Sequence, residues 1–198
     1  MEVSEETEAQ TFMMAKKNAG FSILEVVIVI ALMLVVIAFA LPNLNGMLQS
    51  YRAMNDVRGI AAQLSLARMR AAATSQPARL NFDLTANTYQ LELCTSLCNT
   101  ANAIYAIETG AAAQNLSQGV TFGSGSVISP AVGQTTLAQS SLIFFNSRGV
   151  SVDSTGSPIG TAGIYITNSA GRVYAVTVSI GGQPTTQQYV GGTTWKTF

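Results

Sequence analysis

A single carboxylate lies near the start of a long apolar stretch of the chain. Glu25 is the only ionisable side chain between Phe21 and Leu41. About 20 apolar residues suffice for a helix to cross a bilayer, and a charge inside such a span is costly and usually has a partner. Gly20, directly before the stretch, gives a protease close access to the backbone. We therefore expect cleavage after Gly20, a new amino terminus at Phe21 and a role for Glu25 in assembly.

Two lysines precede the apolar stretch and predict how it is oriented. Lys16 and Lys17 favour a leader that stays in the cytoplasm, because positive residues beside a span remain on the inner side. The rest of the chain is then expected in the periplasm, anchored by a single pass through the inner (cytoplasmic) membrane and its lipid. Methionines at Met1, Met13 and Met14 leave the true start of the leader open.

The chain offers few groups for catalysis or for metal binding. It has no histidine, and its two cysteines, Cys94 and Cys98, are too few for a zinc site, which needs about four ligands. A disulfide is the favoured interpretation in an exported segment, and two free thiols are the alternative. Without a nucleophile motif or paired carboxylates in the remainder, we expect no enzyme, no metal and no cofactor.

The chain is neutral overall, with ten basic and ten acidic residues. Without the leader's two lysines and four glutamates, eight basic residues face six acidic ones. DNA binding needs an exposed basic patch, and after Arg172 the last 26 residues carry only Lys196. Nucleic acid is therefore not expected as a partner.

The apolar stretch is expected to continue as a longer helix. Pro42 should kink it, and Pro77 marks its end. Beyond Pro42 an apolar stripe recurs at steps of three and four residues, which predicts a face that packs on the following domain. The stripe comprises Leu44, Met47, Leu48, Tyr51, Met54, Val57, Ile60, Ala61, Leu64 and Ala67.

From Ala78 onwards the pattern changes to a period of two, which predicts β-strands. Residues 109–140 are rich in small and polar residues and predict a long loop or a low-complexity insertion, with a short strand at 120–122. Gly181-Gly182 and Gly191-Gly192 punctuate the tail. The expected hairpins join 80–84 to 89–93, 142–145 to 150–152 and 164–167 to 172–180, and 103–107 is a weaker strand.

Several residues also have plainer interpretations. Glu25 could be an interfacial carboxylate that the helix dipole favours, and Gly20 could be an ordinary loop glycine. Arg68 and Arg70, on the later part of the helix, could form a solvated face or a pair that binds a partner.

The segment Gly20-Phe21-Ser22-Ile23-Leu24-Glu25, followed by an apolar helix, resembles the class III signal of type IV pilins and pseudopilins. The region downstream resembles the GspH/FimT branch of these proteins. The residues that carry this second resemblance are Leu64–Ala72, Ile143–Gly149 and Gly171–Val173.

The resemblance implies a processing and assembly pathway. A prepilin peptidase would cut between Gly20 and Phe21 and methylate the Phe21 amine, giving N-methylphenylalanine. Glu25 would then pair with the amino terminus of a neighbouring pilin or pseudopilin, and two opposite charges in a low-dielectric layer are far better together than apart. The implied function is a minor pseudopilin of the type II secretion pseudopilus. A FimT-like minor pilin for pilus assembly or DNA uptake is the alternative.

The expected fold is α+β, a lollipop-like long amino-terminal helix packed on an antiparallel β-sheet domain. The predicted parts are a leader at 1–20, a transmembrane helix at 21–41, its amphipathic continuation at 42–76 and a periplasmic β-rich GspH-like domain at 77–198.

Overall fold

The protein is described by a computed structural model over residues 21–98, 102–108 and 111–198, with only the backbone described at 40–43. Residues 45–198 form one compact unit, and residues up to 44 belong to a separate one. The predicted leader, Gly20 included, lies outside the described residues.

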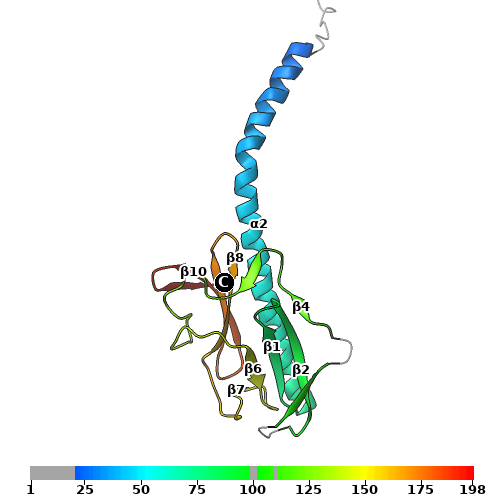
Figure 1. The fold of residues 1–198 in the computed structure, drawn as a ribbon, viewed down its shortest axis with the longest axis vertical. Helices are drawn as coiled ribbons and strands as arrows, with labels where there is room; N and C mark the ends of the chain where they lie inside the picture. Colours follow the sequence, from blue (N-terminus) through cyan, green and yellow to red (C-terminus); the bar gives the residue numbers. More distant parts are fainter. Residues whose placement is uncertain (1–20, 99–101, 109–110) are drawn as a thin grey trace, which may run out of the picture. The chain divides into compact units, whose positions relative to one another are not determined.

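The long helix expected from the sequence is confirmed as α2 (Ile23–Thr74), shown in blue to cyan in Figure 1. At its end the Thr74 hydroxyl donates to the Arg70 carbonyl at 2.8 Å, and Ser75 adopts a positive φ of 53°. A residue in the left-handed conformation past the last turn, with a proline soon after it, is typical of a helix end. Pro77 occupies that place.

One face of the second half of α2 is completely buried. Its residues recur at steps of four and three, which places them in one line along the helix. They are Ala53, Val57, Ile60, Leu64, Ala67 and Ala71, all 0% exposed. The predicted stripe is wrong at its beginning, because the core starts only at Ala53. The earlier members Leu44, Met47, Leu48 and Tyr51 are 51–58% exposed.

The first antiparallel sheet contains the predicted hairpin that follows α2. Its strands are β1 (Ala78–Asp83), β2 (Thr88–Ser96), β3 (Ile104–Ile107), β4 (Gln114–Asn115), β6 (Leu142–Phe145) and β7 (Ser151–Val152). The order is β3-β2-β1-β6-β7, and β4 also pairs with β2. The two-residue strand β4 was not predicted, since its Gln-Asn sequence carries no apolar alternation.

The second antiparallel sheet has the order β11-β10-β9-β8-β5. Its strands are β5 (Val120–Phe122), β8 (Ala162–Asn168), β9 (Val173–Val178), β10 (Pro184–Gly191) and β11 (Thr194–Thr197). The glycine pairs expected to punctuate the tail lie at the turns before and after β10, while β10 and β11 themselves were not predicted. Strand β10 is rich in Thr and Gln and lacks the apolar alternation that predicts a strand. Its strand conformation is stabilised by pairing with β9.

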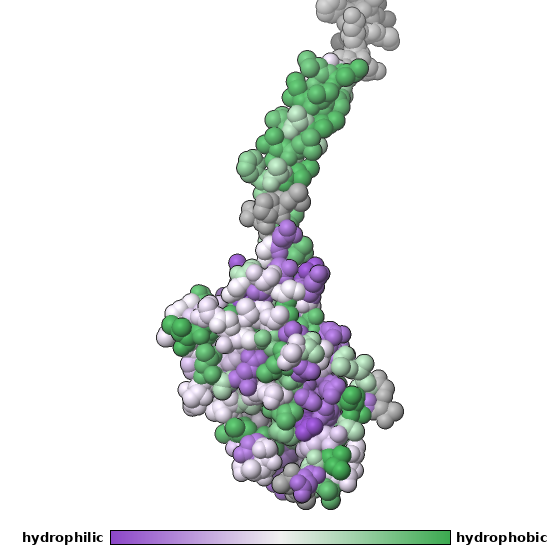
Figure 2. Space-filling model, viewed as in Figure 1, coloured by the Kyte–Doolittle hydropathy of each residue, from purple (hydrophilic) through white to green (hydrophobic). Residues whose placement is uncertain are grey.

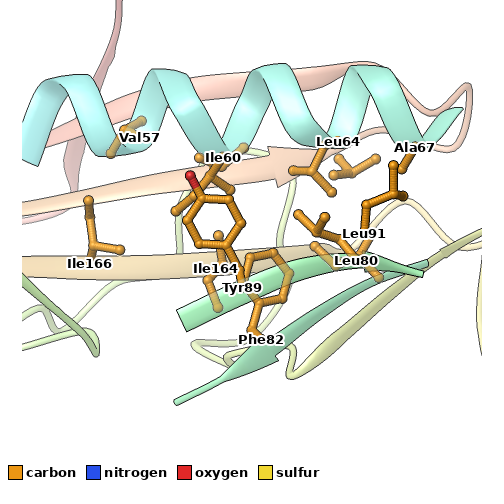
Figure 3. Packing of buried hydrophobic residues seen from close by; sticks show 14 of the residues in the cluster. Val57, Ile60, Leu64, Ala67, Leu80, Phe82, Tyr89, Leu91, Ile164 and Ile166 are labelled. Carbon is orange, nitrogen blue, oxygen red and sulfur yellow. The ribbon is translucent and has the colours of Figure 1, made fainter. Parts of the chain in front are cut away.

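The two sheets and α2 share one core (Figure 3). Alternate residues of each strand point inward, as the period of two requires. From the first sheet come Leu80, Phe82, Tyr89, Leu91, Ile143 and Phe145; from the second come Ile164, Ile166, Tyr174, Val176 and Val178. The second half of α2 is therefore one wall of the β-unit.

Residues 123–140 cover the other face of the second sheet, and we call them the covering segment. Val127 and Ala131 are buried there against Tyr165, Val173 and Ala175. A low-complexity insertion is therefore the wrong interpretation for this part of the chain. Two small apolar residues spaced four apart were too weak a pattern to reveal it.

Polar contacts also hold the covering segment in place. The Ala131 amide donates to the Tyr165 hydroxyl at 3.0 Å. Val132 and the buried Gln187 exchange two hydrogen bonds of 2.8 Å each, in which the Val132 amide donates to Oε1 and Nε2 donates to the Val132 carbonyl. Because these buried polar groups are satisfied, the segment belongs to the folded unit.

Arg68 joins the helix to both sheets. Its guanidinium donates to Gln183 Oε1 at 3.1 Å, and its side chain packs beneath the turns at Gly149 and Gly182. Arg70, two residues nearer the helix end, forms an ion pair with Glu108 at 3.1 Å. Both arginines thus have partners within the chain, and Arg68 is a structural side chain instead of part of a solvated face.

Candidate functional site

The amino end of α2 is defined by a cap. The Leu24 amide donates to the Ser22 hydroxyl at 3.3 Å, and the Val26 amide donates to the Ser22 carbonyl at 3.2 Å. Serine is a favoured N-cap because its oxygen satisfies a first-turn amide that has no partner within the helix. Glu25 lies in this first turn, where the helix dipole favours a carboxylate. The residues Ser22–Glu25 therefore fix both where the helix begins and where its charge lies.

Apolar side chains surround the first part of α2, as the green surface in Figure 2 shows. The large ones from Phe21 to Phe39 are 44–85% exposed. Glu25 is the one ionisable side chain among these residues. Apolar surface of this extent marks contact with a membrane or with other proteins.

No single helix among the described residues is long and apolar enough to cross a membrane. By length and composition, the pieces Ile23–Phe39 and Leu44–Thr74 of α2 could do so as a pair with a break between them. The break falls at residues 40–43, which include Pro42, the site of the predicted kink. The single span expected from the sequence remains a prediction.

The structure describes part of the predicted processing site. Phe21 and Glu25 lie at the same end of α2, and both are exposed. Gly20 lies outside the described residues, so cleavage after Gly20, methylation of Phe21 and pairing by Glu25 remain predictions. In the other unit, Cys94 near the end of β2 forms the expected disulfide with Cys98 just after the strand, and their Cα atoms lie 5.8 Å apart.

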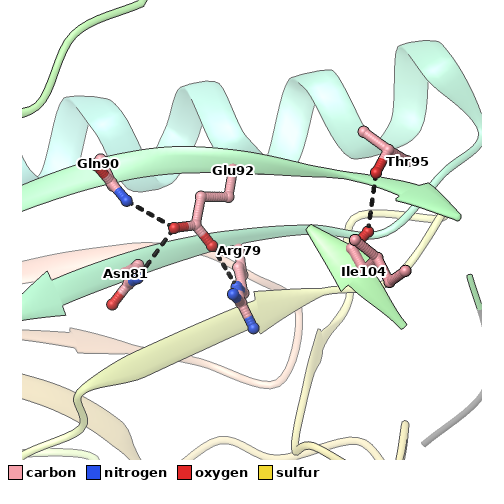
Figure 4. Close-up of polar contacts among 6 residues, drawn as sticks. All are labelled: Arg79, Asn81, Gln90, Glu92, Thr95 and Ile104. Carbon is pink, nitrogen blue, oxygen red and sulfur yellow. Dashed lines mark hydrogen bonds and ion pairs between the residues drawn. The ribbon is translucent and has the colours of Figure 1, made fainter. Parts of the chain in front are cut away.

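A buried carboxylate on the outer face of the first sheet was missed by sequence reasoning (Figure 4). Glu92 is 5% exposed and accepts hydrogen bonds from Arg79 at 2.6 Å, Asn81 at 2.9 Å and Gln90 at 2.7 Å. The register places Arg79 directly opposite Glu92. Arg79 also lies 4.2 Å from the ring centre of Tyr105, a cation–π contact. From the sequence, these four residues could be recognised only as polar positions on the outward face of two strands. That three of them donate to the Glu92 carboxylate could not be seen.

The Glu92 cluster sets the sign of one pH effect. Burial alone would raise the pKa of Glu92, but the hydrogen bonds from Asn81, Arg79 and Gln90 and the charge of Arg79 outweigh it and lower the pKa. A carboxylate with a lowered pKa stabilises the fold above its unfolded pKa and loses that contribution as the pH falls through the folded value.

We expect Glu92→Gln to lower the free energy of unfolding by about 2 kcal/mol at neutral pH, because hydrogen bonds to a charged group are lost. The difference from wild type should shrink between about pH 5 and pH 3. Burial raises the pKa of Asp56, so the effect of its titration on stability has the opposite sign. Asp56 is present in both wild type and Glu92→Gln, so its contribution cancels in the difference. Denaturant unfolding across this range measures the difference, and a constant gap would contradict the role of the charge.

Comparison with known proteins gives a match for the amino-terminal segment. Residues 15–41 match the family described as the prokaryotic N-terminal methylation motif. No curated protein matches the chain.

Two solved structures of the minor pseudopilin EpsH from the type II secretion system of Vibrio cholerae are similar at low identity. One is 10% identical, covers 74% of this chain and 96% of its own, and has a TM-score of 0.37. The other is 14% identical, covers 72% of this chain and 96% of its own, and has a TM-score of 0.45.

The methylation motif spans the predicted cut and the start of α2, including Phe21 and Glu25. After it come the exposed apolar helix and the antiparallel sheets of an α+β fold. The chain thus carries the prokaryotic N-terminal methylation motif at the start of an exposed apolar helix, ahead of an α+β unit.

Proposed function

We propose that the protein is a minor pseudopilin, a structural subunit of the type II secretion pseudopilus. The observation that carries this proposal is the exposed apolar start of α2 with its one carboxylate, inside a methylation motif. A surface of this kind needs other apolar helices or lipid around it. A filament of similar subunits, formed from a membrane pool, supplies both.

Maturation would follow the predicted parts of the chain. A prepilin peptidase removes residues 1–20, cutting between Gly20 and Phe21, and methylates the new amine. Residues 21–41 hold the subunit in the inner membrane, and the β-rich part at 77–198 lies in the periplasm behind the helical continuation at 42–76. In the filament the Glu25 carboxylate pairs with the terminal amine of the neighbouring subunit, which sets the axial position of each new subunit.

The alternative, a FimT-like minor pilin that captures DNA, would need exposed cations free to meet phosphates. Several arginines of this chain are engaged internally. Arg79 pairs with Glu92, Arg70 pairs with Glu108 and Arg68 bonds Gln183. These three arginines are not free to meet DNA phosphates, which reduces the basic surface available for DNA capture and favours the secretion role.

Two measurements separate the candidate machines. Deleting the gene should impair export of secreted enzymes and leave surface pili intact if the subunit serves secretion, and should do the reverse if it serves a pilus. A gel shift with the full-length protein in detergent at low salt tests DNA capture directly. Micromolar binding that weakens steeply with salt would favour the FimT-like alternative.

Processing is tested by the intact mass of the mature protein. We expect the mass of Phe21–Phe198 with one added methyl group, because the peptidase both cuts and methylates. Gly20→Leu should leave the full precursor, since a bulky side chain obstructs the close approach of the protease to the backbone. Gly20→Ala is the matched, milder change. A mature mass that is unaffected by Gly20→Leu would refute the cleavage site.

A further inference from the structure

The end of the β-unit at which α2 enters carries two exposed arginines. Arg52 lies on α2, and Arg172 follows the β8–β9 turn. The Arg52 side chain and the β8–β9 turn both contact the backbone segment before β5. The Arg52 guanidinium donates to the Gln118 carbonyl at 3.5 Å, and the Ser169 amide of the β8–β9 turn donates to the Gly119 carbonyl at 2.8 Å. One exposed arginine and the turn that leads to the other therefore meet at one short strip of chain.

Acidic groups do not neutralise these two cations. Among the described residues neither Arg52 nor Arg172 forms an ion pair. Asp56, one helical turn beyond Arg52, accepts hydrogen bonds from the Ser117 amide at 2.9 Å and the Ser117 hydroxyl at 2.8 Å. Its carboxylate ties α2 to the β-unit through Ser117 and forms no ion pair with either arginine, so both guanidinium groups are left for an outside anion.

The helix immediately before Arg52 is suited to a membrane boundary. Leu44, Met47, Leu48 and Tyr51 are 51–58% exposed and lie on one helical face. At about 1.5 Å per residue, the apolar residues 21–41 match a hydrocarbon core of about 30 Å, so the face that follows them in the chain would lie at headgroup level. Tyrosine at the headgroup level and arginine reaching towards phosphates are the usual pair at such a boundary.

We propose that Tyr51, Arg52 and Arg172 form a headgroup-binding surface that contacts anionic phospholipids while the subunit waits in the membrane. The inference rests on the membrane anchoring in the proposed function. A guanidinium binds a phosphate through paired hydrogen bonds, so two arginines beside an apolar face match a phospholipid with its acyl chain alongside. Contact with lipid would hold the β-unit against the bilayer before assembly.

The test uses the full chain in vesicles of phosphatidylcholine, with or without phosphatidylglycerol, and with the Cys94–Cys98 disulfide intact. A nitroxide on Ser169→Cys reports proximity to a paramagnetic chelate carried on lipid headgroups. The same label on Ser147→Cys, in the turn after β6 beside Arg68, is the matched site at the other end of the unit. The test variants are Arg52→Gln and Arg172→Gln, singly and combined, and Arg148→Gln is the charge-matched control for each single change.

We expect the label at position 169, and not at 147, to contact headgroups when phosphatidylglycerol is present. The contact population should fall about fivefold for each arginine removed and should also fall with added salt. Arg148→Gln should have no effect. Equal contact in neutral vesicles, or no loss in the double variant, would overturn the inference.

Two further outcomes distinguish a failure of the lipid-binding proposal from a failure of the proposed function. Label–label contacts that grow with protein density, without headgroup contact, would assign this surface to a neighbouring subunit and overturn the lipid proposal alone. Failure of the chain to enter vesicles of either composition would overturn the membrane anchoring and the lipid proposal together.

Discussion

Replacing Glu25 with glutamine should leave the protein processed and methylated, yet almost absent from the assembled filament. The predicted cut precedes Phe21, and the carboxylate lies a helical turn beyond it. Loss of the charge leaves the terminal amine of the neighbour unpaired in a low-dielectric layer. Removing one member of a buried ion pair typically costs about 3–5 kcal/mol, which corresponds to a loss of more than about a hundredfold in incorporation.

Incorporation is measured as the share of mature protein that cross-links to neighbouring subunits, normalised to the membrane pool. Glu25→Asp is the matched control, because it keeps the charge and shortens the side chain, and it should retain partial assembly. A Glu25→Gln subunit that is incorporated like wild type would show that the carboxylate serves only the helix dipole, the plainer interpretation of this residue.

Gly182→Ala should be the most destabilising small substitution that we predict in the β-unit. A Cβ at Gly182 would lie only 2.3 Å from the Gly149 carbonyl oxygen and 3.1 Å from Arg68 Cδ. The first obstacle is backbone, so it cannot move aside as a flexible side chain would. The residue also has a φ of +75°, which costs an L-amino acid about 1–2 kcal/mol. We expect a total loss above about 4 kcal/mol, in the exceptional range for a point mutation.

Gly171→Ala is a matched control for the backbone term. Gly171 has the same φ of +75° in the β8–β9 turn, but nothing lies within 4 Å of its added Cβ. Its substitution should therefore lower the thermal midpoint by only about 2–8 °C, while Gly182→Ala should lower it by more than about 10 °C. Equal losses for the two variants would mean that the turns at Gly149 and Gly182 do not meet as described.

The sequence predicted those parts of the fold that carry a strong local pattern. A long apolar run followed by steps of three and four residues identified α2, and alternation identified the hairpin of β1 and β2. The disulfide was predicted from the position of its cysteines in an exported segment. Each of these features is encoded by residues that are neighbours in the chain.

The missed features depend on contacts between segments far apart in sequence. Strand β10 is polar and is completed by its pairing with β9. The covering segment is held by Tyr165 and Gln187, which lie 34 and 55 residues beyond the backbone groups that they bind. Glu92 was visible as a strand residue, but its convergence with Arg79, Asn81 and Gln90 required the register of two strands. For the candidate site, the motif around Phe21 and Glu25 could be predicted. The exposure of the apolar side chains from Phe21 to Phe39 could be seen only in the structure.

The buried face of α2 also determines how the subunit bears mechanical load. From Ala53 to Ala71 the helix contacts both sheets, so a pull along its axis must slide this entire face past the strands at once. Such shear loading breaks many contacts together, unlike peeling, which breaks them one after another. Near the carboxyl end of α2, Arg68 adds a further connection, because its side chain packs against the turns at Gly149 and Gly182 and its guanidinium donates to Gln183. Force applied to the apolar half of the helix would therefore be transmitted to the β-unit without first detaching it.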